Sequence, residues 1–488
     1  MLCFLCACTV GPDYRRPPVV VPVAYKEAVP SGWQRARALD AIDRGRWWSV
    51  FRDPVLDGLE RQIDISNQNL AAAEAAFRRS EAIVAEARAG FFPTLTVNAQ
   101  AQRSRSSGTG RIANFFTATE QASWVPDLWG KVRRTVESNV ESAQASAGDI
   151  ASARLAAQAQ LASDYMQLRV ADELKRLLDA AATAYTESLR ISTNQYNAGV
   201  AAASDVAQAR TQLESTRAQA IAVGVLRAQL EHAIAVLIGR PPADLTIVPL
   251  PKVPPLPDIP AGLPSALLQR RPDIAAAERR VAAANAQIGV AETAFFPTVT
   301  LSADSGTAAA MLSKLLSASS RVWSLGANLV QTVFDAGARH AQVEQARAAY
   351  DATVADYRQT VLSGFQQVED ELAALRILAQ QAAAEDSAVA AARQAESIIF
   401  NQYRAGTVPY TNVVVAQTAA LGNAETALNV RQSRLIAAVA LIEALGGGWD
   451  SSQLPTPQRI ESDSPLNFSP LPPADAAPRF WDFLPKLW

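Results

Sequence analysis

The sequence repeats itself once, and this internal repeat constrains the fold more than any other feature of the chain. Short matches recur in one order at a nearly constant offset of roughly 200 residues, which chance matches would not do. Each half therefore carries the same order of elements, which is helix, two strands, long helix, turn and helix. The matching segments are Asn69–Glu74 with Asp273–Glu278, Phe91–Thr94 with Phe295–Thr298, Asp127–Gly130 with Phe334–Gly337, and Tyr196–Gly199 with Tyr403–Gly406.

The repeat also gives the domain organisation. Residues between the halves are too rich in proline for a helix, and so are parts of both ends of the chain. We expect signal residues in 1–8, an extended segment in 9–53, the repeats in 54–240 and 265–448, a Pro-rich linker in 241–264 and a tail in 449–488.

Two long segments, 130–197 and 338–404, contain no proline and predict long helices. Apolar residues recur in them at spacings of three and four, which is typical of a narrow packing seam. A helix of this length is a rod of roughly 100 Å, a coiled-coil dimension. The predicted seams are Leu161, Tyr165, Leu168, Ala171, Leu174 and Leu178 in the first, and Val343, Ala346, Tyr350, Val354, Tyr357 and Val361 in the second.

Each half also has two shorter predicted helices, at 54–89 and 204–238 in the first half. Because the rise per residue is constant, two short helices laid end to end match one long helix. The chain can thus run out along a long helix, turn near Gly199 and return halfway. We expect a long helical tunnel with the linker and tails at mid-height.

Four short segments alternate between apolar and polar residues. They start after Pro93 and Pro297 and return over 115–128 and 322–334, with connecting loops at 103–111 and 306–321. Such alternation over about ten residues is typical of transmembrane strands, and also of half-buried strands in a soluble sandwich. No segment reaches the run of apolar residues that a transmembrane helix needs. Trp124, Trp129 and Trp323 near the strand ends suit an interfacial belt.

A four-stranded open sheet leaves two unpaired edges, which lipid does not tolerate. If the strands cross a membrane, several chains must therefore pool them into one closed barrel. A soluble coiled-coil scaffold is the alternative from another class, but it leaves the paired alternating strands unexplained.

The three cysteines, Cys3, Cys6 and Cys8, all lie at the amino end, so no disulfide bond can cross-link the predicted helices and strands. Leu5–Cys8 has the form of a lipoprotein cleavage site before an acylated cysteine, although incidental cysteines in an apolar N-terminus are an alternative. The segment Cys8–Pro17, Cys-Thr-Val-Gly-Pro-Asp-Tyr-Arg-Arg-Pro, resembles the start of mature NodT-type lipoproteins, a branch of the TolC-like outer-membrane efflux family. Thr9 is not the Asp that this family associates with inner-membrane retention.

This resemblance covers nearly the whole chain and implies the quaternary structure. It implies an α+β membrane protein in which three chains form a β-barrel of about 12 strands, four strands per chain. The barrel would continue into a long periplasmic α-helical barrel with a mixed equatorial belt. Acylation of Cys8 would anchor the protein at the outer membrane.

The implied function is an outer-membrane exit duct of a tripartite efflux pump that passes drugs or other small molecules. Its implied partners are two further copies, a periplasmic membrane-fusion adaptor, a proton-driven inner-membrane pump of the RND type and outer-membrane lipid. A duct for type I protein secretion is the alternative within the family. We expect no cofactor and no catalysis, since no catalytic motif occurs and His232 and His340 are too scattered for a metal site. A net charge of -2 gives no indication of nucleic-acid binding.

The resemblance also implies a docking site and a constriction. The adaptor-docking tips would be the helix turns, at Tyr196, Gly199 and Val200 and at Tyr403, Gly406 and Thr407, although glycine there also ends a helix. The constriction would comprise Asp205, Tyr403 and Asn412, with a hydrogen bond between Asp205 and Tyr403 as a lock. An equally supported role for Asp205 is capping its own helix. Asn412 and Val415 stand where relatives carry aspartates, and Val408 where some carry a basic residue, which argues against an acidic ring.

Overall fold

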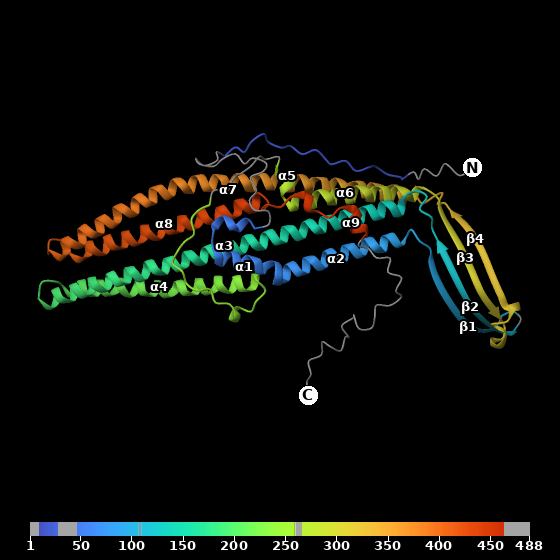
Figure 1. Cartoon of the computed structure of the whole chain (residues 1–488), viewed down its shortest axis with the longest axis horizontal. Helices are drawn as coiled ribbons and strands as arrows, with labels where there is room; N and C mark the ends of the chain where they lie inside the picture. Colours follow the sequence, from blue (N-terminus) through green and yellow to red (C-terminus); the bar gives the residue numbers. More distant parts are fainter. Residues whose placement is uncertain are drawn as a thin grey trace, which may run out of the picture.

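A computed structural model describes residues 9–27, 46–105, 107–108, 110–257, 259 and 266–462. The molecule is long and narrow, with helices along its length and a curved sheet at one end (Figure 1). The main helices are α1 (Pro54–Ser66), α2 (Gln68–Ala89), α3 (Lys131–Asn197), α4 (Ala203–Leu237), α5 (Leu267–Arg270), α6 (Pro272–Glu292), α7 (Ala338–Arg404), α8 (Tyr410–Ala444) and α9 (Pro457–Ser462).

The sheet contains β1 (Thr94–Arg105), β2 (Ile112–Trp124), β3 (Thr298–Ala309) and β4 (Arg321–Val330), in that spatial order and with every pair antiparallel. The strands extend further into the predicted loops than we expected, since residues 103–105 and 306–309 are in β1 and β3. The predicted ends of the return strands were wrong, because β2 stops at Trp124 and β4 at Val330. Residues 125–128 and 331–334 instead connect the sheet to the long helices.

The two long helices start in the same way, as their place in the repeat requires. Gly130 and Gly337 precede α3 and α7 with φ of 83° and 90°. In each case an aspartate side chain accepts backbone N–H groups at the helix start. Asp127 accepts from Val132 and Arg133, and Asp335 accepts from Gly337 and Arg339. Carboxylates in this position satisfy free N–H groups and complement the helix dipole.

Each long helix spans the full helical region, and the short helices pair with its two halves. Both α3 and α7 contain 67 residues, which makes rods of roughly 100 Å. Nearer the sheet, the neighbours run in the order α2, α3, α6, α7, and at the far end they run α4, α3, α8, α7. The helices therefore form a single wall, and Figure 1 shows them side by side along its length.

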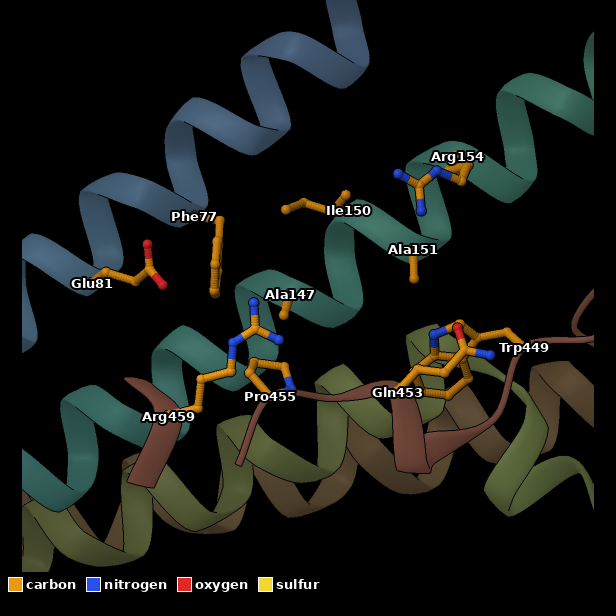
Figure 2. A pocket seen from close by; sticks show the side chains of 10 residues that line it. All are labelled: Phe77, Glu81, Ala147, Ile150, Ala151, Arg154, Trp449, Gln453, Pro455 and Arg459. Carbon is orange, nitrogen blue, oxygen red and sulfur yellow. The ribbon is translucent and has the colours of Figure 1, made fainter. Parts of the chain in front are cut away.

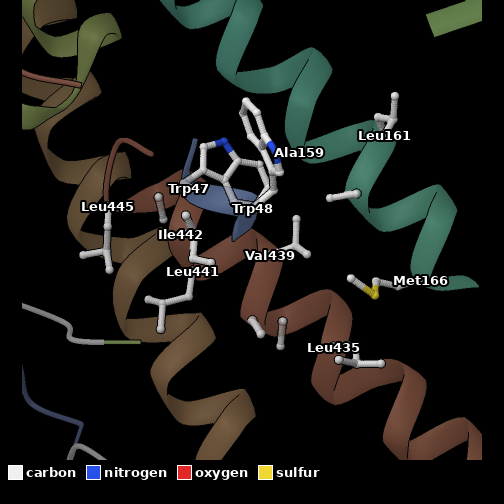
Figure 3. Packing of buried hydrophobic residues seen from close by; sticks show 14 of the residues in the cluster. Trp47, Trp48, Ala159, Leu161, Met166, Leu435, Val439, Leu441, Ile442 and Leu445 are labelled. Carbon is white, nitrogen blue, oxygen red and sulfur yellow. The ribbon is translucent and has the colours of Figure 1, made fainter. Parts of the chain in front are cut away.

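The largest buried cluster lies where short and long helices meet, at mid-length. Trp47 and Trp48 pack edge-to-face there, with ring centroids 6.0 Å apart. Figure 3 shows these rings between α3 and the end of α8, against Leu441 and Ile442. This cluster joins the N-terminal segment, both repeats and the linker, so it holds the two halves in one body.

One structural finding differs from our expectation about membrane helices. Among the described residues, α4 is long and apolar enough to cross a membrane by length and composition. A single helix of this kind is weak evidence for a span, and α4 packs along the far half of α3 as one arm of a helical hairpin.

Candidate functional site

The sheet has one apolar and one polar face. Residues directly opposite each other in antiparallel strands project from the same face, so the strand register assigns the faces. The apolar face carries Leu95, Val97, Ala99, Phe116, Ala118, Ala122, Trp124, Leu301, Ala303, Trp323, Leu325, Ala327 and Leu329. The other face carries Thr96, Asn98, Gln100, Thr119, Gln121, Ser302, Asp304, Ser324 and Asn328.

Glu120 is the acidic exception on the apolar face, which also carries Ser305 and Thr307, and sequence reasoning missed it. It lies opposite Val97 on β1 and Ser305 on β3, so it projects from the apolar face. The residue-by-residue alternation along β2 would have revealed it.

Both lateral edges of the described chain are open. Strand β1 pairs only with β2, and β4 pairs only with β3. The helices α2 and α4 continue the β1 edge, and α7 continues the β4 edge. Large apolar side chains remain exposed along both helical edges, namely Ile221, Val225 and Val236 on α4 and Leu362, Ile377 and Ile398 on α7. The two edges are suited to pairing between copies of the chain.

The helix turns farthest from the sheet have matching backbone geometry. Gly199 and Gly406 have φ of 78° and 73°, and the N–H of each donates to the tyrosine carbonyl three residues earlier, at 2.9 Å. The following residues, Val200 and Thr407, close the turns by donating to Gln195 and Gln402 at 3.0 Å. Left-handed residues of this kind end helices, so the turn geometry alone does not require a functional role.

The tyrosines of the two turns differ. Tyr196 is half exposed, whereas Tyr403 is buried against Tyr410, with ring centroids 5.2 Å apart. The hydroxyl oxygens of Tyr403 and Ser192 lie 2.9 Å apart. Burial raises the pKa of Tyr403 above its usual range, and raises that of Tyr410 to about 12.

Asp205 lies in the first turn of α4, close enough for its charge to raise the pKa of Tyr403. Within one chain, however, the hydrogen-bonding partner of the Tyr403 hydroxyl is Ser192. The expectation that Asp205 caps its helix was wrong, because the N-cap is Ala202 and no side chain caps there. Asp205 instead complements the helix dipole from inside the first turn. Asn412 and Val415 are exposed in the corresponding part of α8.

A buried polar seam joins α3 to α8 just behind the tips, and the sequence patterns considered above did not reveal it. Tyr185 donates to the carbonyl of Gln417 at 3.2 Å, and the Gln417 amide donates to Ser188 at 3.1 Å. Two buried oxygens of the seam, the Tyr410 hydroxyl and Gln417 Oε1, have no hydrogen-bond partner. One sequence signal could have indicated the polar seam. Tyr185, Ser188 and Ser192 are spaced by three and four residues, so they share one face of α3, and none of them belongs to the predicted apolar seam of that helix.

The N-terminal segment, residues 9–27, runs as a strap from the sheet end along the wall (Figure 1). The Val10 N–H donates to the carbonyl of Trp129 at 3.1 Å, and Thr9 packs against Gly130. Arg134 then holds the carbonyls of Val10 and Gly11, each at 3.1 Å. Cys8 lies outside the described residues, but its neighbour Thr9 lies at the junction of sheet and helices.

The strap ends at mid-length in a set of ion pairs and hydrogen bonds. Tyr14 donates to Glu278, Arg16 donates to the Tyr357 hydroxyl at 3.1 Å, and Glu27 accepts from Arg376 at 2.6 Å. These contacts connect the strap to both α6 and α7.

A pocket of about 200 Å³ lies between α2, α3 and the segment after α8. Figure 2 shows Phe77 and Arg154 on one side and Trp449 and Arg459 on the other. Arg154 also pairs with Asp64 at 2.8 Å. The pocket marks where the C-terminal segment docks on the wall. In the part of the chain that the structure describes, no group of three or more His, Cys, Asp or Glu residues could hold a metal ion.

Comparison with known proteins gives one family match. The model of the family described as "Outer membrane efflux protein" matches residues 60–240 and 263–447. A probable efflux pump outer membrane protein, TtgC of Pseudomonas putida, is 31% identical over 450 residues, covering 91% of this chain and 93% of that protein. The pyoverdine export outer membrane protein OpmQ of Pseudomonas aeruginosa is 32% identical over 443 residues, covering 87% of this chain and 92% of that protein.

Solved structures give the same picture. The outer-membrane channel OprN superposes with a TM-score of 0.83 at 30% identity, covering 91% of this chain and all (100%) of that one. The structure of CusC superposes with a TM-score of 0.81 at 26% identity, covering 90% of this chain and 100% of that one. The CmeC channel of Campylobacter jejuni superposes with a TM-score of 0.85 at 24% identity, covering 94% of this chain and 98% of that one. At this identity the likeness supports the fold alone.

Proposed function

Because this chain belongs to the outer membrane efflux protein family and forms an outer-membrane exit duct, we propose how its parts serve that duct. The strands of three copies close a β-barrel in the outer membrane, and the helical walls close a periplasmic tunnel beneath it. The duct conducts passively, and we propose that the chain itself carries out no reaction. Its cargo is a drug or another small molecule delivered by an inner-membrane pump.

The open edges are the observation that carries this proposal. Edge strands in lipid must be paired, because unsatisfied backbone groups cost several kcal/mol each there. The β1 edge and the β4 edge lie on opposite sides of one chain, so copies can join head to tail until the ring closes. The exposed apolar residues on α4 and α7 lie along the same two edges and support the same pairing.

We propose that the tips at Tyr196, Gly199 and Val200 and at Tyr403, Gly406 and Thr407 receive the periplasmic adaptor. The turns lie at the end of the molecule farthest from the sheet (Figure 1). Val200 is 76% exposed, and a Cβ atom added at Gly199 or Gly406 would meet no residue beyond its chain neighbours within 4 Å. The tips thus offer an uncovered surface. A proton-driven pump of the RND type would then supply the energy, since the chain carries no nucleotide-binding motif.

Asp205, Tyr403 and Asn412 make up the proposed constriction. The Ser192–Tyr403 contact holds α7 against α3, and the buried polar seam of Ser188 and Gln417 holds α8 against α3. The charge of Asp205 acts on Tyr403. In the assembled ring, the Asp205 carboxylate can accept a hydrogen bond from the Tyr403 hydroxyl once that hydroxyl leaves Ser192. Replacing Asp205 by Ala together with Tyr403 by Phe should raise single-channel conductance in planar bilayers. Unchanged conductance would reject the lock.

We propose that Cys8 is acylated. Thr9 packs at Gly130, in the junction between the end of β2 at Trp124 and the start of α3 at Lys131, so acyl chains on Cys8 would start near the membrane boundary. Cys8→Ala should remove labelling by radioactive palmitate, while a Cys3→Ala control retains it. Persistent labelling of the Cys8 variant would contradict the assignment.

The efflux role is tested in a strain that lacks this gene. The strain should become several-fold more sensitive to drugs, and the wild-type gene should restore resistance. A variant with glutamate at Val200 should fail to restore resistance and fail to co-purify with the adaptor, although it still forms trimers. Glutamate at Gly108, at the opposite end of the molecule, is the matched control. Loss of protein secretion with unchanged drug sensitivity would instead favour the type I secretion alternative.

A further inference from the structure

The segments at the extracellular end of the sheet contain basic residues and no acidic ones. They are the two strand connections with the adjoining strand ends, residues 103–111 and 310–321, and neither contains Asp or Glu. Both connections lie at the end of the sheet away from the helices (Figure 1). The wall, the tips and the constriction give these cations no role. The five basic residues are Arg103, Arg105, Arg111, Lys314 and Arg321.

Three of the arginines project from the apolar face of the sheet rather than into the duct. Successive residues of a strand alternate between its faces, so Arg103 and Arg105 share a face of β1 with Val97. In the same way, Arg321 shares a face of β4 with Trp323. Val97 and Trp323 both belong to the apolar face. The three guanidinium groups therefore stand on the outer surface of the barrel, and we call them the basic rim.

The basic rim lies at the extracellular limit of the apolar band. Arg103 is nine residues from Thr94, where β1 starts, and Arg321 is nine residues from Val330, where β4 ends. Nine residues rise roughly 30 Å along a strand, which is roughly 23 Å across a membrane for a strand tilted by about 40°. The apolar band of such barrels is about 25 Å tall. Both side chains therefore reach the headgroups of the outer leaflet, where an arginine on the lipid face costs little.

The rim arginines are open to a ligand. All three side chains are exposed, and the Nε of Arg105 donates to the carbonyl of Gly110 at 3.2 Å. Among the described residues, no carboxylate forms an ion pair with Arg103, Arg105 or Arg321. Glu120 is the acidic residue of this face, but it lies on β2, two strands away from Arg321. Three unpaired cations at the headgroup level therefore indicate an anionic partner in the membrane.

Apolar side chains near the rim favour a lipid over a free anion. Ile112 lies opposite Arg105 and is 59% exposed. Leu312 and Leu316, in the connection between β3 and β4, are 66% and 91% exposed, and Lys314 lies between them in the sequence. Free phosphate would leave these apolar side chains in water. A phosphorylated lipid offers anionic groups to the cations and acyl chains to the apolar side chains.

We propose that the basic rim binds the phosphate groups of the phosphorylated glycolipid of the outer leaflet, an inference that rests on the proposed barrel. In the closed barrel, β4 of one copy pairs with β1 of the next, so Arg321 of one copy joins Arg103 and Arg105 of the next at each seam. Arginine binds phosphate through paired hydrogen bonds. The lipid A disaccharide carries a phosphate at each end, so one glycolipid can bridge two copies and stabilise the seam.

Binding of fluorescently labelled lipid A to full-length trimers in detergent tests this proposal. One rim variant combines Arg103→Gln, Arg105→Gln and Arg321→Gln, and fluorescence anisotropy follows the lipid. The wild type should bind lipid A several-fold more tightly than the rim variant. Lipid A should also raise the temperature at which wild-type trimers dissociate, and it should raise that of the rim variant less.

Two further variants are controls for charge and for fold. Lysine at the three rim positions should retain most of the binding, because an ammonium group also pairs with phosphate. A matched variant removes the same amount of charge from exposed helical positions, and its affinity for lipid A should equal that of the wild type. It combines Arg190→Gln, Arg217→Gln and Arg347→Gln.

Equal affinity of the wild type and the rim variant would overturn the proposal, and so would equal affinity for lipid A without its phosphates. Displacement of lipid A by an equal concentration of phosphatidylglycerol would assign the rim to phospholipid and contradict a glycolipid site. If the rim variant forms no trimers, Arg103→Gln and Arg321→Gln are measured singly, and unchanged affinity in both rejects the site. Wild-type trimers that bind no lipid A reject the rim alone. Absence of wild-type trimers rejects the barrel, and the rim with it.

Discussion

The hydroxyl oxygens of Ser192 and Tyr403 lie 2.9 Å apart in the buried interface between α3 and α7. This contact joins the first repeat to the second within about two helical turns of the tip. It stands where we had expected Asp205 to be the direct partner of Tyr403.

Removing either hydroxyl should loosen the tip. A buried donor or acceptor that loses its partner costs about 1–3 kcal/mol, so Ser192→Ala and Tyr403→Phe should each raise single-channel conductance. The double variant should add less than the sum of the two, because both changes remove one interaction. Tyr196→Phe, at the exposed equivalent in the first repeat, should leave conductance unchanged. Additive effects of the two changes would contradict a direct interaction.

Adjacent positions on β1 test the two faces of the sheet. Val97→Arg should sharply reduce heat-resistant trimers in the membrane, because an arginine on the lipid face costs about 2–4 kcal/mol near the bilayer midplane. Asn98→Arg, on the polar face, should preserve the trimers and shift ion selectivity toward anions. Equal trimer yields for the two variants would argue against the assignment of the faces.

Glu120→Leu should stabilise the barrel. Glu120 projects from the apolar face opposite Val97, where an acidic side chain is unfavourable. The temperature at which trimers dissociate in detergent should rise for Glu120→Leu and should fall or stay constant for Gln121→Leu, on the polar face. A lower dissociation temperature for Glu120→Leu would show that the carboxylate has a stabilising partner in the assembly.

Glu60 should make stability depend on pH. It is fully buried in α1, neither carboxylate oxygen has a hydrogen-bond partner, and burial, with a contribution from the charge of Asp64, raises its pKa well above its usual range. Because its pKa is raised, Glu60 binds its proton more tightly in the folded state than in the unfolded state. The free energy of unfolding is therefore highest below the unfolded pKa of about 4.3 and falls as pH rises through the folded pKa. Thermal unfolding between pH 5 and pH 8 should show this slope.

Glu60→Gln should remove that slope, while Glu74→Gln, at an exposed position of α2, should keep it. A wild-type protein whose thermal stability is constant over this pH range would contradict a protonated Glu60.

Periodicity and repetition predicted much of the architecture. The proline-free runs predicted α3 and α7 almost to the residue, because helix ends there are set by local residues, Gly130 and Gly199 among them. The strand ends were less accurate, because β2 and β4 stop where the chain leaves the sheet for the wall, which is a tertiary constraint. The fold class was confirmed by the solved structures of related channels.

The candidate site was harder to predict, because it depends on contacts between the two repeats. The equivalence of Tyr196 and Tyr403 suggested similar roles, yet only Tyr403 is buried. The seam of Ser188 and Gln417 connects residues far apart in the sequence, so no local pattern reveals the pairing. The tips, the constriction and Cys8 remain predictions.

A disulfide between the two open edges of the sheet tests directly whether the barrel is built from several chains. Within one chain, β1 and β4 are three strand spacings apart, about 14 Å, which is too far for a disulfide. Asn98→Cys, combined in turn with Ser324→Cys or Asn328→Cys in a chain whose native cysteines are serine, can therefore cross-link only separate copies. On non-reducing gels we predict covalent dimers and trimers for at least one pair, with no larger species. Monomers alone, from protein recovered in the outer membrane, would contradict a barrel built from several chains.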